Sequence, residues 1–452
     1  MKQTERANFG SRLGIILATA GSAVGLGNVW RFPTMTGQNG GAAFILIYII
    51  CVLVLGIPCM LNEFIIGRRA QANTARAYEK LSNGTPWRFI GYFGVFTGFL
   101  IAGYYCVVSG WCLQYVAASM TGHLDGSRES VKAYFDNFSS NPWQPIVCLL
   151  LFFAITHFVI ARGVQKGIEK ASKLMMPLLF ILLVIIAVAA CLMPGAEAGI
   201  KFLFSPDFSK VDGDVLLSAL GQAFYSLSLG MGCLCTYASY FTRDTHLTKS
   251  AIHIVSLDTL IAILAGLMIF PAVFSVGGHV DEGASLVFIT LPNVFSQAFS
   301  SMPLVGHFIA LLFYLLLSVA ALTSLISLHE VSTAFFHEEL NISRQRGALI
   351  VTVLCSIIGI FCSLSFYSAD IQLFGMPLFE FFDFTTGQIF LPLGGFLTCL
   401  FLGWYVPRQT VRDEFTNGGT LRGRFFGVYM FFVRFVCPVC ILLIFLHQRG
   451  FI

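Results

Sequence analysis

Charged side chains are scarce in this sequence: only 11% of its 452 residues are Asp, Glu, Lys or Arg, whereas 56% are hydrophobic. A water-soluble domain carries about twice that share of charge. The scarcity excludes one large soluble enzyme. Together with the mean hydropathy of +0.80, it indicates a membrane protein that crosses the bilayer many times.

The sequence also lacks the cysteine pattern of a secreted disulfide framework. Its 13 cysteines are odd in number and lie in apolar runs, which is typical of small buried side chains. Two closely spaced pairs, Cys233/Cys235 and Cys437/Cys440, have no second cluster beside them and do not predict a metal site. No cleavable signal peptide is evident, so we expect the first apolar helix to be retained.

Long apolar runs are what the sequence has in place of charge. They predict an all-α polytopic membrane protein with about eleven transmembrane helices. No long linker separates them, so we predict one transmembrane domain over residues 1–452. The predicted spans are residues 11–37, 42–67, 89–120, 144–161, 171–193, 214–241, 250–276, 302–336, 348–366, 377–405 and 425–446.

The lysines and arginines are distributed unevenly over the predicted loops. With the amino terminus inside, about twenty of the 27 lie in inner loops, and Arg31 and Arg434 fall within spans. The outer loops hold only Arg128, Lys132, Lys201, Lys210 and Arg449. This bias predicts a cytoplasmic amino terminus and an outer carboxyl terminus. It also accounts for the net charge of +4 without nucleic-acid binding.

Two of the predicted spans are interrupted by polar and flexible residues. The first contains GSAVGLGNVWRFP, in which Asn28 and Arg31 lie deep in the span, and the sixth contains GQAFYSLSLGMG. Such residues are costly in lipid unless they face protein or water. Breaks in spans one and six predict an inverted repeat of five helices each, residues 11–193 and 214–405, plus an extra helix at 425–446.

The breaks also predict a binding site. Unwound backbone exposes carbonyls that coordinate cations and amides that hold a carboxylate. A zwitterion together with a small cation fits both. The alternative, that the glycines only allow close packing of helices, is common in membranes.

Several stretches are long and specific enough to compare with known families: GSAVGLGNVWRFP, NGGAAF, GIP, GYYCVVSGW, GQAFYSLSLGMG, TYASY and ALTSLIS. They resemble the neurotransmitter:sodium symporter family, in particular its bacterial amino acid transporters, over nearly the whole chain. The resemblance implies a 5+5 fold with unwound helices 1 and 6, located in the cytoplasmic membrane of a bacterium. It further implies a symporter, not an enzyme, that uses sodium to take up hydrophobic or aromatic L-amino acids by alternating access.

By this resemblance a pair of sodium ions binds at the breaks. The first site is implied to use the Ala23 carbonyl, Asn28, Ser226 and Asp258, completed by the substrate carboxylate. The second is implied to use the carbonyls of Gly21, Val24 and Ala320 with the hydroxyls of Thr323 and Ser324. From the residues alone, those two hydroxyls fit hydrogen bonds to their own helix backbone equally well.

Asp258 is the most informative single residue. A carboxylate within a span is expensive and is expected to have a cationic partner, unless it lies near a helix end and is solvated. Many animal relatives have asparagine there and recruit chloride. The carboxylate of Asp258, with Ala262 where those relatives place a serine, implies transport without chloride.

The resemblance also places the substrate. The Tyr105 hydroxyl and the amides of Leu26 and Gly27 are implied to hold its carboxylate, and its amine is implied to meet acceptors at Ala23, Tyr225, Ser226 and Ser228. The side-chain pocket is implied to be Ile101, Tyr105, Val108, Tyr225, Ser228, Met231, Ser324 and Leu328. This pocket is mostly apolar, which argues against charged substrates. From the residues alone, an interfacial or core aromatic is favoured over a ligand for Tyr105, since the chain has 14 tyrosines.

Gates are implied above and below the site. Arg31 and Asp383 match an outer ion pair. Arg6 and Glu338 match an inner pair, with Tyr240 nearby and Phe9 packed over them. Phe9 stands where tryptophan is usual, and Glu338 stands where aspartate is. Glu63, near the end of the second span, either braces the unwound part of the sixth or lies at the interface.

Other classes predict different patterns. An ion channel predicts a repeated selectivity loop, and a membrane enzyme predicts a metal signature or a serine–base pair; His329 and Glu330 lack a second histidine at helical spacing. A carrier of another small neutral amine or amino acid, or a non-transporting amino acid sensor on the same fold, fits the residues as well. The sequence does not fix the preferred amino acid, the sodium stoichiometry, proton counter-transport, or whether the protein is a monomer or a weak dimer.

Overall fold

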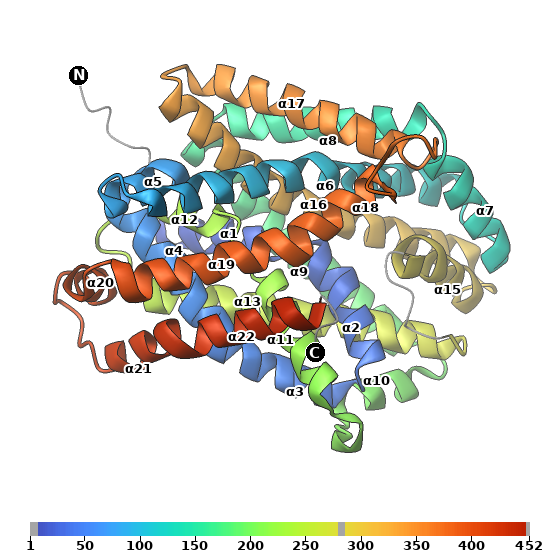
Figure 1. The fold of residues 1–452 in the computed structure, drawn as a ribbon. Helices are drawn as coiled ribbons and strands as arrows, with labels where there is room; N and C mark the ends of the chain where they lie inside the picture. Colours follow the sequence, from blue (N-terminus) through green and yellow to red (C-terminus); the bar gives the residue numbers. More distant parts are fainter. Residues whose placement is uncertain (1–7, 279–284, 449–452) are drawn as a thin grey trace.

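The structure is a computed structural model that describes residues 8–278 and 285–448. Figure 1 shows long helices lying side by side, with the short helices α5 and α20 at one end and α7 and α15 at the other. Apart from the two-residue strands β1 (Gln372–Leu373) and β2 (Met376–Pro377), the regular structure of the described residues is helical. The predicted all-α fold is confirmed.

Nine helical stretches of the described residues are long and apolar enough to cross a membrane. They are Ala42–Ala70, Pro86–Thr121, Gln144–Ala161, Val164–Cys191, Leu247–Ser275, Pro303–Glu339, Arg344–Leu364, Leu378–Tyr405 and Phe426–Gln448. Each corresponds to a predicted span. The fourth of these stretches begins earlier than the predicted residue 171, because a π-helical turn precedes the α-helix.

Three of these stretches contain α-helices joined end to end by π-helical turns, two begin with a 3-10 or π-helical segment, and four are single α-helices. Their elements are α3 (Ala42–Cys51), η2 (Val52–Gly56), α4 (Ile57–Ala70), η3 (Pro86–Arg88), α6 (Phe89–Thr121), α8 (Gln144–Ala161), η4 (Val164–Glu169), α9 (Lys170–Cys191), α13 (Leu247–Ser275), α16 (Pro303–Glu339), α17 (Arg344–Leu364), α18 (Leu378–Thr385), η7 (Thr386–Phe390), α19 (Leu391–Leu400), η8 (Phe401–Tyr405), α21 (Phe426–Phe431), η9 (Phe432–Val436) and α22 (Cys437–Gln448).

The first and sixth predicted spans are the interrupted ones. In the first, α1 (Arg12–Ala23) is followed by the π-helical turn η1 (Gly27–Arg31) and by α2 (Phe32–Gln38), with a bend of 55° between the halves. In the sixth, residues 227–232 separate α11 (Gly213–Ser226) from α12 (Cys233–Ala238). Both predicted breaks are therefore present, and every predicted span has a helical counterpart. The bounds of the two repeats stay a prediction.

Shorter elements form the connections at the two ends of the long helices. They are α5 (Thr74–Ser82), α7 (Arg128–Ser139), α10 (Ala196–Phe204), η5 (Phe208–Lys210), η6 (Leu286–Thr290), α15 (Leu291–Ala298) and α20 (Arg408–Phe415). Side-chain caps define where some begin: Asn73 accepts a hydrogen bond from the Arg76 amide at α5, and Ser127 from the Ser130 amide at α7.

The breaks are enclosed by other helices. α1 packs against α9, α13 and α16, and α16 packs most extensively against α6. α11 contacts η1 and α2, and α12 contacts α1. Unwound backbone in lipid would leave its N–H and C=O groups without partners. This enclosure therefore allows both breaks to exist at the centre of the protein.

Candidate functional site

A small cavity of about 50 Å³ lies at the two breaks. Every residue predicted to contact substrate lines it except Val108, which lines an adjoining cavity of about 400 Å³. The two cavities share the residues Leu26, Gly27, Tyr104, Tyr105 and Tyr225. The small cavity is thus the inner end of a wider vestibule.

Hydrogen bonds across the small cavity hold the broken ends together. The Leu26 amide donates to the Tyr105 hydroxyl at 3.4 Å, and the Ser228 hydroxyl donates to the Ser22 carbonyl at 2.9 Å. Tyr105 is therefore aimed at the break of the first helix, as predicted for a residue that shares a carboxylate with these amides. Its role in binding stays a prediction.

Asp258 is fully buried on α13 and forms the centre of a polar cluster. Its Oδ1 accepts from the Asn28 amide nitrogen at 2.7 Å, and its Oδ2 accepts from the hydroxyls of Ser226 at 3.0 Å and Tyr48 at 3.3 Å. All three partners are uncharged. The alternative of a solvated carboxylate at a helix end is wrong, and a buried carboxylate held only by neutral donors favours a bound cation.

Ala262 lies one helical turn after Asp258 and is fully buried. The two side chains share a face of α13 because residues four apart lie above one another on a helix. Alanine brings no hydroxyl to this face, and the Tyr48 hydroxyl is already directed at the carboxylate. The fixed negative charge of this cluster is that of Asp258.

The residues of the predicted second cation site also converge. Thr323 and Ser324 on α16 both direct their hydroxyls at the Val24 carbonyl, at 3.3 and 3.2 Å. The Thr323 hydroxyl also donates to the Ala320 carbonyl of its own helix at 2.9 Å. Its contacts therefore agree both with a hydroxyl at the second cation site and with a hydroxyl bonded to its own helix backbone. A Cβ on Gly21 would lie 3.3 Å from the Thr323 Cβ, which places that backbone beside the same group.

On the vestibule side, Arg31 and Asp383 line the wider cavity together. The Arg31 guanidinium lies 4.1 Å from the centre of the Tyr225 ring, and among the described residues these two charged groups form no ion pair within 4.0 Å. The predicted outer ion pair is therefore not formed in this structure, although both residues line the same cavity.

On the opposite side of the site, Phe9 packs against α12 and the loop that follows it. Its ring lies 6.0 Å from those of Tyr237 and Tyr240, and its amide donates to the Tyr240 carbonyl at 3.2 Å. Glu338 accepts from the backbone amide of Asn73 at 2.9 Å. Arg6, the predicted partner of Glu338, lies outside the described residues, so that pair stays a prediction.

Glu63 supports the unwound part of the sixth helix from α4. Its Oε1 accepts from the Gly230 amide at 2.8 Å, and its Oε2 accepts from the Cys235 amide at 3.2 Å. These are amide groups that the break removes from helical bonding. The interpretation of Glu63 as a brace describes its contacts, and the interfacial alternative is wrong because the side chain is buried.

We therefore expect Glu63→Gln to destabilise the protein and to weaken ligand binding. The amide has one acceptor oxygen, so one N–H of the break loses its partner, at a cost of about 1–3 kcal/mol. Thermal unfolding of the purified variant in detergent measures this cost. Glu129→Gln, on the exposed face of α7, is the control, and equal midpoints for the two variants would contradict the role of Glu63.

Sequence reasoning missed several groups that the structure brings to the site. Tyr48 contacts Asp258. Its place within a long apolar run gave no indication of a polar contact. On the inner side, Glu330 is fully buried, pairs with Arg344, and accepts from the Tyr240 hydroxyl at 2.6 Å. Glu330 did carry a signal, because a carboxylate within a span requires a partner. Further lining residues that were missed are Ser22, Gly25, Tyr104, Cys233 and Leu391.

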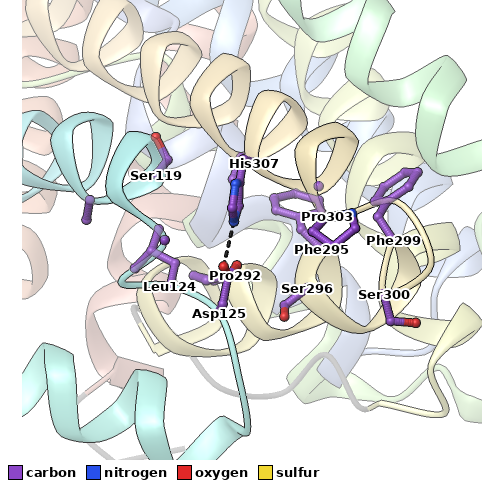
Figure 2. A pocket seen from close by; sticks show the side chains of 14 residues that line it. Ser119, Leu124, Asp125, Pro292, Phe295, Ser296, Phe299, Ser300, Pro303 and His307 are labelled. Atoms are coloured by element: carbon purple, nitrogen blue, oxygen red, sulfur yellow. Dashed lines mark hydrogen bonds and ion pairs between the residues drawn. The ribbon is translucent and has the colours of Figure 1, made fainter.

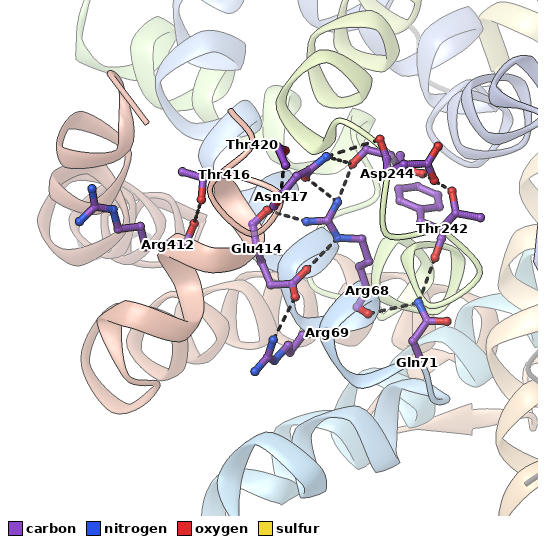
Figure 3. A network of polar contacts seen from close by, with 12 residues as sticks. Arg68, Arg69, Gln71, Thr242, Asp244, Arg412, Glu414, Thr416, Asn417 and Thr420 are labelled. Carbon is purple, nitrogen blue, oxygen red and sulfur yellow. Dashed lines mark hydrogen bonds and ion pairs between the residues drawn. The ribbon is translucent and has the colours of Figure 1, made fainter. Parts of the chain in front are cut away.

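Two other polar features lie away from the breaks. A cavity of about 240 Å³ lies between α15 and the ends of α6 and α16, where the His307 Nε2 is 2.6 Å from the Asp125 Oδ2 (Figure 2). In Figure 3, Arg68 of α4 donates to Glu414 of α20 at 2.7 Å and to the Asn417 side chain at 2.9 Å. Neither contains a predicted site residue.

Two facing helix breaks around a buried carboxylate, enclosed by long apolar helices, define a membrane carrier with a central binding site. Comparison with known proteins agrees. The sequence profile of the Sodium:neurotransmitter symporter family matches residues 6–134 and 127–449. The chain belongs to this family. It is an integral membrane transporter and not an enzyme.

Individual relatives cover nearly the whole chain. The chain is 38% identical over 453 residues to YhdH, an uncharacterized sodium-dependent transporter of Bacillus subtilis, covering 100% of this chain and 99% of the relative. It is 24% identical to the human sodium- and chloride-dependent GABA transporter 2, covering 84% and 69%. The crystal structure of MhsT in complex with L-phenylalanine superposes with a TM-score of 0.88 at 42% identity, covering 98% of this chain and 100% of that one.

Proposed function

We propose that this protein takes up hydrophobic or aromatic L-amino acids together with sodium ions, without chloride, by alternating access. The observation that supports it most is the buried Asp258 carboxylate beside the first helix break: three neutral groups hold it, and among the described residues no basic group contacts it. Sodium fits this cluster because hard cations prefer oxygen ligands. A substrate carboxylate at the Leu26 and Gly27 amides would lie against the same ion, which couples the two.

The chemistry of the cavity supports the substrate class. Its side-chain region is formed by Ile101, Met231 and Leu328 with Ser228 and Ser324, and none of these is charged. MhsT, which superposes closely, was crystallised with L-phenylalanine. Methionine is flexible and adapts to ligands of different shape. A pocket of this kind takes several apolar side chains and rejects lysine and glutamate.

Independence from chloride is proposed from the charge at α13. The human relative is named as sodium- and chloride-dependent. In this chain Asp258 supplies a fixed negative charge next to the proposed sodium site, and Ala262 offers no hydroxyl to an anion. A second sodium ion is proposed at Val24, Thr323 and Ser324. The amino terminus is proposed to face the cytoplasm of a bacterium, because the basic residues gather on that side.

Competition for uptake tests the substrate class. Proteoliposomes with an inward sodium gradient would take up labelled L-phenylalanine in the presence of each of the twenty amino acids. We expect leucine, tryptophan and similar amino acids to compete, and lysine and glutamate not to. Strong competition by either charged amino acid would contradict the proposed pocket.

The same vesicles separate the remaining alternatives. Replacing chloride by gluconate at constant sodium is expected to leave uptake unchanged, and a loss of uptake would contradict chloride independence. A sensor would bind phenylalanine without accumulating it. Accumulation above the equilibrium level therefore distinguishes a carrier from a sensor.

A further inference from the structure

Arg434 is a charged residue within the last membrane-spanning stretch, Phe426–Gln448. It lies eight residues after the start of that stretch, which at 1.5 Å per residue is about 12 Å along the helix. An arginine at such a depth is costly unless an anion or water meets it. None of the proposed transport steps uses this residue.

The described part of the protein supplies uncharged partners for Arg434 and no charged one. Its Nε donates to the Gly403 carbonyl at 2.6 Å, and its Cζ lies 5.4 Å from the centre of the Trp404 ring. The Trp404 indole in turn donates to the Arg434 carbonyl at 3.3 Å. Among the described residues no carboxylate forms an ion pair with Arg434 within 4.0 Å. Its positive charge is thus oriented but not neutralised.

The surface around Arg434 faces outward from the helix bundle and is aromatic. Trp404, Phe431 and Phe435 are 57%, 56% and 48% exposed. Their rings contact one another, with 5.5 Å between Trp404 and Phe435 and 5.6 Å between Phe431 and Phe435. Exposed aromatic rings at this position in a membrane helix meet lipid. The guanidinium therefore lies within reach of lipid headgroups, since long basic side chains extend toward the interface.

The nearby connection between the last two spans adds positive charge. It holds four exposed arginines: Arg408, Arg412, Arg422 and Arg424. Of its two acidic residues, Glu414 is already bound by Arg68 and Arg69 of α4 (Figure 3). The other, Asp413, accepts from Gln409. Basic residues immediately next to a membrane span attract anionic lipids by about 1 kcal/mol each.

We propose that Arg434, together with the exposed arginines of the 408–424 connection, binds an anionic phospholipid. The phosphate lies on the guanidinium, which suits the planar donors of arginine, and the acyl chains lie against Trp404, Phe431 and Phe435. The lipid neutralises the charge of Arg434, which no carboxylate among the described residues balances. A lipid is favoured over free phosphate because the site opens on the membrane-facing surface.

Native mass spectrometry of the purified full-length protein tests the proposal. The protein is incubated with equal amounts of phosphatidylglycerol and phosphatidylethanolamine, and the ratio of bound lipids is measured. We expect the unmodified protein to prefer phosphatidylglycerol, and Arg434→Gln to lower that preference about tenfold. Arg162→Gln is the matched control, because Arg162 also lies over an aromatic ring at a helix end. Its Cζ is 3.7 Å from the centre of the Phe158 ring. Because Arg162 also lies next to a span, Arg162→Gln is expected to lower the preference, but by less than Arg434→Gln does.

A second variant protects the test from misfolding of the first. Arg408→Gln/Arg424→Gln changes only exposed side chains and is also expected to lower the preference about tenfold. An excess of inorganic phosphate is expected not to displace the lipid, and displacement would identify a free-phosphate site instead. An unchanged lipid ratio in the double variant and in folded Arg434→Gln, or an equal loss in Arg162→Gln, overturns the proposal.

Discussion

Replacing Asp258 with asparagine is expected to weaken sodium activation of uptake by at least about a hundredfold. The carboxylate is fully buried among the neutral groups of Asn28, Ser226 and Tyr48. A cation bound there loses its charged partner, and breaking a buried charge pair costs about 3–5 kcal/mol, where each 1.4 kcal/mol is tenfold. The sodium concentration that gives half-maximal uptake measures the effect.

The chloride response of the same variant tests the charge argument separately. Asparagine removes the fixed negative charge, so added chloride is expected to restore part of the uptake of Asp258→Asn while leaving the unmodified protein unaffected. Asp136→Asn, on the exposed face of α7, serves as the control and is expected to behave like the unmodified protein. Unchanged sodium activation in Asp258→Asn would remove this residue from the proposed sodium site.

Replacing Gly230 with alanine is expected to disrupt the break of the sixth helix. Gly230 has a φ of +83°, and a Cβ there would lie 2.4 Å from the Leu391 carbonyl oxygen and 3.0 Å from the Gly395 nitrogen. The left-handed backbone costs about 1–2 kcal/mol for alanine, and the contact with fixed backbone adds to it. We expect a total of at least about 3 kcal/mol and a thermal unfolding midpoint lower by about 3 °C or more.

A matched glycine separates this effect from the mere loss of a glycine. Gly387 lies in η7, has no atom within 4 Å of a built Cβ and has no positive φ. Gly387→Ala is expected to leave the unfolding midpoint unchanged or to raise it slightly, since alanine favours helix by about 1 kcal/mol. Similar midpoints for the two variants in detergent would show that the backbone at Gly230 is not constrained.

The sequence predicted the helices and their breaks because both depend on local composition. A run of about 20 apolar residues is enough to predict a span, and glycines with Asn28 inside such a run are enough to predict an interruption. The resemblance to a family then placed residues such as Tyr105 and Ser324, and the structure brings them to one cavity. Their individual roles in binding remain predictions.

What the sequence did not predict depends on contacts between distant parts of the chain. Tyr48 and Asp258 are 210 residues apart, and no local pattern indicates that they meet. The π-helical turns, such as η4 before α9, change helix bounds without changing the hydropathy. The pair of Glu330 with Arg344 was accessible in principle, since a buried carboxylate within a span must be paired.

The central claim is that the two breaks bind an amino acid and sodium together. Uptake of labelled L-phenylalanine into proteoliposomes, with an inward gradient of sodium or of potassium at the same ionic strength, tests it most directly. The account predicts accumulation above equilibrium with sodium, none with potassium, and, in chloride-free buffer, none for Asp258→Asn at the same sodium concentration. Equal uptake in sodium and potassium would contradict it.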